Sequence, residues 1–353
     1  MKYVKCKIVL LLLANWLSAS SQSPGFCGTP SNIPDFLTNL SGRFQAAQNS
    51  YIIGIYLHVM RNSDGTGGQT QTEVNTAFNT LVSDYRPYNI TFELLGTDEI
   101  NDNTYNNQTN FTTDNNGDGK FDNFTVNSHS NAIDIYLFGN DKLNFGLASN
   151  IPGTALVIGG NAFGINLASS HVLSHEVGHC LGLFHTFHGT WIYEAFGSCP
   201  ELANGSNGAT CGDFVADTPA DPARIFDCGS QGTCTWNCSG SYVDANGQQY
   251  NPDTHLFMAY TFPNCMNHHT QGQVSRMLST IANSSLLSNT VIPCQTRTIS
   301  NEVFSNSILI TDCKINISNS SIVNNSSVVI DAIYGTTING LFEVTLGSTL
   351  EIK

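Results

Sequence analysis

The sequence predicts an α+β fold, in which a mixed β-sheet packs against helices and a small all-β module follows at the C-terminus. Up to residue 139 the patterned segments come in the order strand, helix, strand, strand, and two further helices lie later in the chain. This order favours a mixed sheet with helices packed on it. From about residue 294 the composition shifts to Ile, Val, Ser, Thr and Asn in short alternating runs, which is typical of strands.

Each element has its own local signal. Residues 51–60 are β-rich and short, as in a central strand, and residues 89–96 and 131–139 predict two more strands. Apolar side chains at helical spacing predict a helix over residues 72–85. A second helix is expected after Ser169 and Ser170, which are candidate N-caps, and a third over 272–282.

The N-terminus has the features of a signal peptide. Three lysines precede an apolar run over residues 8–17, and small residues follow at 18–21. The apolar run is too short to span a membrane, and no later segment approaches 20 apolar residues. We therefore expect residues 1–21 to be removed from a secreted, extracellular protein that has no membrane span.

Charge and cysteine content limit the function classes. The net charge is -14, from 13 basic and 27 acidic residues, which disfavours nucleic acid and anionic lipid as partners. Eight of the 11 cysteines follow residue 190. In an exported chain without CxxC pairs, such a cluster predicts disulfide bonds that hold loops together.

The motif His175-Glu176-Val177-Gly178-His179 carries the chemistry. Two histidines four residues apart share one face of a helix and can bind one zinc ion. Glu176 lies beside that face, where it can act as general base toward a metal-activated water.

The third ligand requires a turn. In a continuous helix His185 would lie roughly 15 Å along the axis from His175 and could not share the ion. Gly182 lies between them, and a glycine in the left-handed conformation can end the helix and reverse the chain. We therefore predict one catalytic Zn²⁺ held by His175, His179 and His185.

The segment HEVGHCLGLFH resembles the long zinc motif of the metzincin metallopeptidases. The segments CGDFVADTP and GQVSRM are similar to the pappalysin family in particular, and the resemblance covers roughly residues 51–277. It implies a mixed sheet with an active-site helix and a backing helix. It also implies a short pro-segment over 22–48, a catalytic domain over 49–293, and a C-terminal module over 294–353 outside the family.

The resemblance assigns further roles. Met258 matches the methionine turn beneath the metal, and Tyr260 matches a tyrosine that can stabilise the oxyanion. Cys27 is a candidate latency ligand that caps the zinc as a thiolate, and the alternative for this residue is a disulfide bond. Pro263 replaces an aspartate that accompanies a preference for arginine, which argues against a basic substrate preference.

Calcium ligands and disulfide partners also follow from the resemblance. Asp213 and Thr218 match calcium-binding positions, Thr218 through its carbonyl. The pattern pairs Cys228 with Cys265, and Cys211 with Cys234 or Cys238. A separate stretch matches the start of a calcium loop but lacks the closing glutamate, so a simple turn is the alternative. Its candidate ligands are Asp114, Asn116, Asp118 and Asp122.

The predicted function is a secreted, zinc-dependent endopeptidase, made as a zymogen, that acts on protein or peptide substrates. The alternative is a secreted surface-binding protein with a structural or latent zinc site. That alternative draws on the C-terminal module, whose composition is typical of modules that attach to surfaces or carbohydrate.

Overall fold

The computed structural model describes residues 27, 29, 50–190, 199–223, 225–238, 242–293, 295–332 and 335–352. The predicted signal peptide and most of the predicted pro-segment lie outside these residues. In the first part of the chain the elements are β1 (Tyr51–Arg61), α2 (Gln71–Tyr85), η2 (Arg86–Tyr88), β2 (Ile90–Asn101), α3 (Asn103–Asn106), β3 (Ile133–Leu137), β4 (Phe145–Ala148), β5 (Ala155–Gly159), β6 (Asn161–Ala162), β7 (Ile165–Asn166), η3 (Leu167–Ser169), α4 (His171–Cys180), α5 (Ile225–Cys228), α6 (Gln271–Asn283), α7 (Ser285–Ser288) and β8 (Val291–Ile292).

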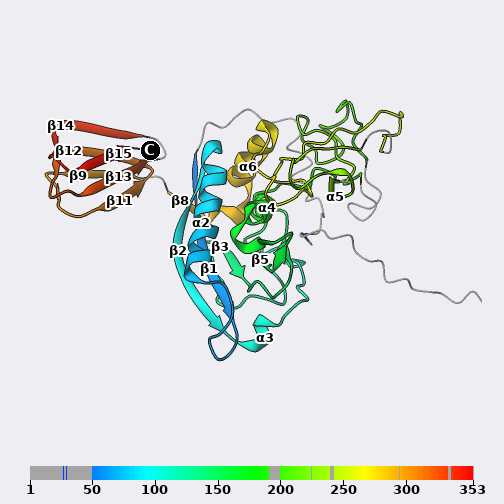
Figure 1. The fold of residues 1–353 in the computed structure, drawn as a ribbon, viewed down its shortest axis with the longest axis horizontal. Coiled ribbons are helices and arrows are strands. Elements are labelled where there is room, and N and C mark those ends of the chain that lie inside the picture. The colour runs from blue at the N-terminus through cyan, green and yellow to red at the C-terminus, as the bar shows by residue number, and fades with distance from the viewer. Residues whose placement is uncertain are drawn as a thin grey trace, which may run out of the picture.

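The predicted mixed sheet is confirmed. Its strand order is β2-β1-β3-β5-β4, and β8 pairs with the start of β1. The pairs among β2, β1, β3 and β5 are parallel, whereas β4 runs antiparallel to β5. Figure 1 shows α2, α4 and α6 beside this sheet. Strand β4 is an edge strand of the sheet, and it contacts α4.

The main core lies between the sheet and helices α2 and α4. Helix α2 turns Val74, Ala77 and Leu81 toward it, and the Tyr85 hydroxyl donates to the Ser174 carbonyl of α4 at 2.7 Å. A capping box between Thr70 and Glu73 fixes the start of α2. The backing helix is thereby packed and hydrogen-bonded against the helix that carries the zinc motif.

The second face of the sheet is covered by the polar stretch that follows β2. Phe111, Phe121 and Phe124 from this stretch are buried against Tyr136 and Phe138 of the sheet side. Their burial gives an otherwise polar loop an apolar anchor. The sheet is thus covered on both faces.

The C-terminal residues form stacked coils of parallel strands. The strands are β9 (Thr296–Ser300), β10 (Val303–Phe304), β11 (Ile308–Asp312), β12 (Lys314–Ile322), β13 (Ser327–Ala332), β14 (Thr336–Val344) and β15 (Thr349–Ile352). β9 and β10 pair in parallel with β12, which pairs with β14, and β11 pairs with β13, which pairs with β15. We call this unit the solenoid. Its own core includes Ile315, Ile317 and Ile330 and is separate from the main core.

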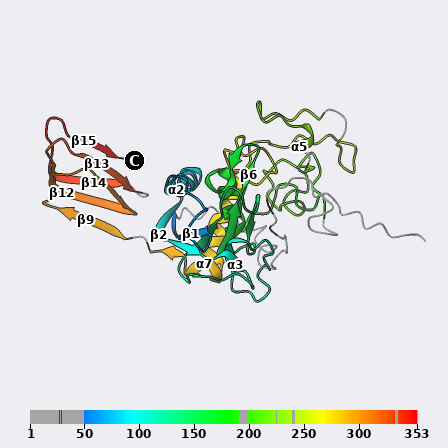
Figure 2. The same ribbon diagram turned by 60° about the horizontal axis from the view of Figure 1, so that its bottom comes forward.

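The solenoid lies to one side of the sheet in both ribbon views (Figures 1 and 2). Arg86, just after α2, forms a two-contact ion pair with Asp331 of β13. Both side chains are partly exposed, so this pair contributes little to stability. Among the described residues, no helix combines the length and apolar character that crossing a membrane requires.

The disulfide pairing predicted for Cys228 is wrong. Cys228 pairs with Cys238, and Cys234 pairs with Cys265. The chain between residues 229 and 236 folds back, and the Asn237 amide donates to the Cys228 carbonyl at 3.1 Å, which brings Cys228 and Cys238 together. The Cα atoms of the two pairs lie 5.1 and 5.5 Å apart, within the range a disulfide spans.

The expected partner of Cys211 is corrected in the same way. Cys211 pairs with Cys199, not with Cys234 or Cys238. The backbone amide of Gly212, the residue after Cys211, donates to the Cys199 carbonyl at 3.0 Å, which closes the short loop between the two cysteines.

Candidate active site

Helix α4 begins at Ser170, whose side chain accepts from the Val172 amide as predicted for an N-cap. The helix ends in a Schellman turn. The Leu183 amide donates to the Gly178 carbonyl and the Gly182 amide to the His179 carbonyl, both at 2.9 Å. Gly182 has φ of 96°, the left-handed conformation that the sequence required. The chain therefore reverses directly after the helix.

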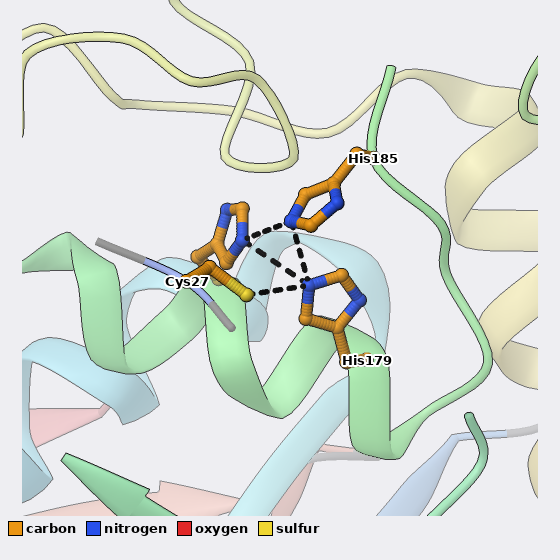
Figure 3. A group of neighbouring side chains, drawn as sticks. Cys27, His179 and His185 are labelled. Carbon is orange, nitrogen blue, oxygen red and sulfur yellow. Dashed lines mark hydrogen bonds between the residues drawn. The ribbon is translucent and has the colours of Figure 1, made fainter. Parts of the chain in front are cut away.

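This reversal brings three imidazoles together (Figure 3). The Nε2 atoms of His175, His179 and His185 lie 3.1 to 3.2 Å from one another. All three rings are buried. Together with Cys27 they form one of two groups, among the described residues, whose ligand atoms lie close enough to share an ion; the other is His58, His129 and Asp134.

Backbone carbonyls orient two of the rings. His175 Nδ1 donates to the Phe257 carbonyl at 2.6 Å, and His179 Nδ1 donates to the Leu183 carbonyl at 2.8 Å. The proton then sits on Nδ1, and the Nε2 lone pair points to the centre of the cluster. Burial lowers the pKa of His175 and of His185 to about 3, so the rings are neutral. The Nε2 lone pairs of His175 and His179, with the buried His185 ring beside them, form a donor set that fits a zinc ion.

Glu176 lies beside the cluster. The position of its carboxylate depends on Gly146 of β4, because a Cβ at residue 146 would overlap the Glu176 side chain. Burial raises the pKa of Glu176 to about 8. Its Oε1 atom is buried and has no hydrogen-bond partner within the described part of the chain. A buried, basic carboxylate next to a metal cluster is suited to proton transfer.

Cys27 and Thr29, which lie in the predicted pro-segment, contact the cluster. Cys27 Sγ lies 3.3 Å from His179 Nε2 and 3.5 Å from Glu176 Oε2. The backbone of Cys27 forms an isolated parallel β-bridge with Gly146 of β4. The Thr29 hydroxyl accepts from the Ala148 amide at 2.8 Å and donates to Glu176 Oε2 at 3.1 Å. Cys27 forms no disulfide. Of the two alternatives for Cys27, the disulfide is therefore excluded.

Met258 and Tyr260 border the histidines from the other side. The Met258 sulfur packs under α4, where a Cβ at Gly178 would approach it to 2.5 Å. The Tyr260 ring lies edge-on to His185 with centroids 4.8 Å apart. Its hydroxyl donates to the Cys27 carbonyl at 2.5 Å. Tyr260 therefore already holds a peptide carbonyl next to the cluster.

A group of buried carboxylates lies in the loop region after the zinc motif. Asp213 and Thr218 are buried, and Asp213 Oδ2 has no hydrogen-bond partner among the described residues. Glu201, which sequence reasoning missed, is fully buried, and within the same residues neither of its carboxylate oxygens has such a partner. Gly208 and Gly212 pack directly on its carboxyl group. Sequence reasoning missed Glu201 because the complete burial of a carboxylate, which is costly when it stays unpaired, cannot be seen in a sequence.

The candidate calcium loop at residues 114–122 forms turns of its own. Asp114 accepts hydrogen bonds from the amides of Gly117, Asp118 and Gly119, and the Asp118 amide also donates to Asn116. Asp122 accepts from the Asn115 amide. These hydrogen bonds stabilise a turn. A simple turn is the alternative to a calcium loop that the sequence left open, because the closing glutamate is missing.

A second histidine group lies on the opposite face of the sheet. His58 and His129 contact Asp134 Oδ1 at 3.2 and 2.9 Å. The Lys120 ammonium lies 3.0 Å from Asp134 Oδ2, and His58 Nδ1 lies 2.7 Å from Asp98. The carboxylate of Asp134 is thus neutralised by a lysine, and the group is a closed network that holds the loop onto β1 and β3.

Comparison with known proteins finds a family match over the region that contains the histidine cluster. Residues 158–282 match the profile of the pappalysin peptidase family, described as pregnancy-associated plasma protein-A. The chain is 28% identical over 260 residues to an extracellular metalloprotease of Podospora anserina, covering 68% of this chain and 76% of that one. It is also 28% identical over 254 residues to one of Neurospora crassa, covering 66% and 75% of the two chains.

Among solved structures, the chain is similar to mature mirolysin of Tannerella forsythia in complex with a cleaved peptide. The TM-score is 0.42 with 18% sequence identity, covering 69% of this chain and 97% of that one.

Gly182→Ala is expected to weaken zinc binding at least tenfold. A Cβ at this position would lie 2.6 Å from Thr280 Oγ1, and alanine is strained at this φ, so His185 would move out of the cluster. Zinc retained after dialysis against a graded chelator measures the effect. Gly164→Ala is the matched control, because Gly164 has φ of 78° and open space around it. Equal zinc retention in the two variants would contradict this role of Gly182.

Proposed function

We propose that this chain, a pappalysin-type metalloendopeptidase, is secreted and hydrolyses peptide bonds in proteins with Glu176 as general base. The observation that carries the proposal is the convergence of three neutral Nε2 atoms, 3.1 to 3.2 Å apart, beside the Glu176 carboxylate. His175, His179 and His185 would hold the zinc ion.

When bound there, zinc acidifies a water molecule and polarises a peptide carbonyl. Glu176 takes a proton from the attacking water and later delivers it to the leaving amine. Burial raises the pKa of this carboxyl, which makes the carboxylate a stronger base than an exposed one.

The open edge of β4 is the proposed substrate groove. Cys27 forms a β-bridge with Gly146, and the Thr29 hydroxyl accepts from the Ala148 amide. These two residues of the chain itself therefore already lie along the edge. A substrate would pair with β4 in the same place, as peptides do when they extend a sheet. The Tyr260 hydroxyl, which now donates to the Cys27 carbonyl, would donate to the substrate oxygen as negative charge develops on it.

The same contacts support latency through the pro-segment. Cys27 places its sulfur within reach of the zinc ligands, and Thr29 hydrogen-bonds to the general base. A thiol at the metal excludes the water that the reaction needs. We propose that the chain is inactive until the segment over residues 22–48 is removed.

Calcium is proposed as a second, structural cofactor. Glu201 and Asp213 supply buried carboxylate oxygens without hydrogen-bond partners within the described residues, and the carbonyl of Thr218 would add a further oxygen ligand. Oxygen ligands of this kind suit Ca²⁺. Burial and neighbouring carboxylates raise the pKa of Glu201 to about 8, which indicates that a cation is required to keep it charged near neutral pH.

Residues 49–293 are proposed as the catalytic domain, and the solenoid as a separate module that attaches the enzyme to a surface or carbohydrate. The separate core of the solenoid supports this division. The relatives named extracellular metalloproteases support an extracellular location.

Glu176→Gln is expected to lower kcat by at least about 100-fold, because it removes the proton acceptor and keeps the shape of the side chain. Cleavage of an unfolded protein by the processed chain, with zinc content measured alongside, tests this. A zinc-loaded variant with full activity would contradict the proposal, as would wild-type cleavage that a zinc chelator leaves unchanged.

Cys27→Ser is expected to give the full-length chain peptidase activity before the pro-segment is removed, because the weaker hydroxyl ligand would not hold the segment on zinc. Activity of the unprocessed wild type and variant is compared at equal zinc content. The wild type should gain activity only on processing, and unprocessed forms that are equally silent would show that the thiol is not the latency ligand.

In calcium-free buffer, stability is expected to fall as the pH rises from about 5 to 8. Burial raises the pKa of Glu201 to about 8 and of Asp213 to about 7, so the folded state holds more protons in this window than the unfolded state, whose carboxyls titrate near 4. Ca²⁺ binds the ionised form and should restore the thermal midpoint at pH 8.

The thermal midpoint is measured at pH 5, 6, 7 and 8 with and without Ca²⁺. Glu201→Gln should remove most of the calcium-dependent gain. A midpoint that does not respond to Ca²⁺ at pH 8 would rule out this site.

A further inference from the structure

Three phenylalanines from separate segments form one aromatic cluster. Phe163 lies at the tip of the β6–β7 hairpin, Phe226 on α5, and Phe262 after the methionine turn. The Phe163 and Phe226 rings are near parallel with centroids 5.5 Å apart, and Phe262 is edge-on to both at 5.0 and 5.3 Å. We call this cluster the aromatic platform.

The platform is continuous with the catalytic cluster. Phe226 packs against the buried group formed by Cys27, Phe187 and Tyr260. The hairpin that carries Phe163 is joined to the start of the groove, because the Asn161 amide donates to Asn144 Oδ1, one residue before β4. The platform therefore lies beside Tyr260 at the end of the groove where β4 begins.

The Phe163 ring of the platform is held rigidly in an exposed position. Phe163 has φ of 55°, an unfavourable backbone conformation for a residue with a side chain. The Gln231 side-chain amide donates a hydrogen bond to the Phe163 carbonyl, and the Asn264 side-chain amide donates to the Gln231 carbonyl. The Cys234–Cys265 disulfide fixes the segments that carry Gln231 and Asn264. The fold thus keeps a large apolar ring 40% exposed next to the active site instead of burying it.

An exposed, rigidly held aromatic ring that is backed by a partly buried ring and a buried one favours an apolar side chain as its ligand. The direction of the substrate decides which residue reaches them. Antiparallel pairing is the more stable ladder, so a substrate strand is expected to run opposite to β4. Its residue after the scissile bond then lies at the start of β4, next to the platform.

We propose that Phe163 and Phe226, backed by the buried Phe262 ring, bind the side chain of the residue that follows the scissile bond, and that they select a large apolar residue there. This inference rests on the proposed peptidase function. Phe163 is the residue to test, because it contributes the most exposed ring and no catalytic group.

The experiment digests a peptide library with the processed enzyme and identifies the cleaved bonds by mass spectrometry. Phe, Leu, Met or Tyr is expected to be enriched after the scissile bond. Phe163→Ala should lower kcat/KM roughly tenfold for a peptide with Phe at that position, and less than about twofold for the same peptide with Ala. Phe163→Leu should recover part of the loss.

Leu94→Ala is the matched control, because Leu94 of β2 is 39% exposed and is not part of the platform. It should leave both kcat/KM values unchanged. Enrichment of Arg or Lys after the bond, enrichment only before the bond, or an equal loss for both peptides in Phe163→Ala would overturn the inference. Absence of any chelator-sensitive cleavage would instead reject the peptidase function itself.

Discussion

The whole site depends on the backbone reversal at Gly182. Ten residues separate His175 from His185, yet their Nε2 atoms lie 3.1 Å apart, because the helix stops in a left-handed turn. The turn buries three imidazoles in contact, which is costly for rings that can neither ionise nor hydrogen-bond to one another through Nε2. A metal ion relieves this cost. Metal binding and the stability of this region are therefore expected to be coupled.

Two other glycines set how closely the elements approach. Gly178 lets α4 lie on the Met258 sulfur, and Gly146 lets β4 lie against the Glu176 carboxylate. The Phe257 carbonyl, one residue before Met258, orients His175. The ligands, the general base and the groove are thus positioned by backbone contacts between regular elements. Such contacts tolerate less movement than flexible side chains would.

Features that depend on local sequence could be predicted, and features that depend on burial could not. The spacing of His175, His179 and His185 around Gly182 gave the ligand set and the turn, because helix geometry connects residues close in sequence. Glu201 lies in a region without periodicity, and only its complete burial marks it. Cys228 was assigned the wrong partner, because disulfide connectivity depends on how loops fold back.

The solenoid was predicted as strands without a strict repeat, and the register explains why. Thr296 lies 18 residues before its partner Lys314, whereas Ile315 lies 21 residues before Thr336, so the coils differ in length. The recurring signal is conformational. Asn301 directly after β9, Asn319 within β12 and Gly340 within β14 all have positive φ, and each comes one residue after the mutually paired residues Ser300, Ser318 and Asn339.

The proposed latent arrangement uses the groups that the proposed reaction needs. Cys27 approaches the metal ligands, Thr29 hydrogen-bonds to the general base, and the Cys27 carbonyl occupies the Tyr260 hydroxyl. The β-bridge between Cys27 and Gly146 of β4 is parallel, whereas a substrate is inferred to pair with β4 in the antiparallel direction. The segment therefore occupies the groove and contacts the catalytic groups. Its Cys27 carbonyl reaches Tyr260 from a chain that runs opposite to the direction inferred for a substrate. Removal of the segment would free all three groups together, without any change in the fold that positions them.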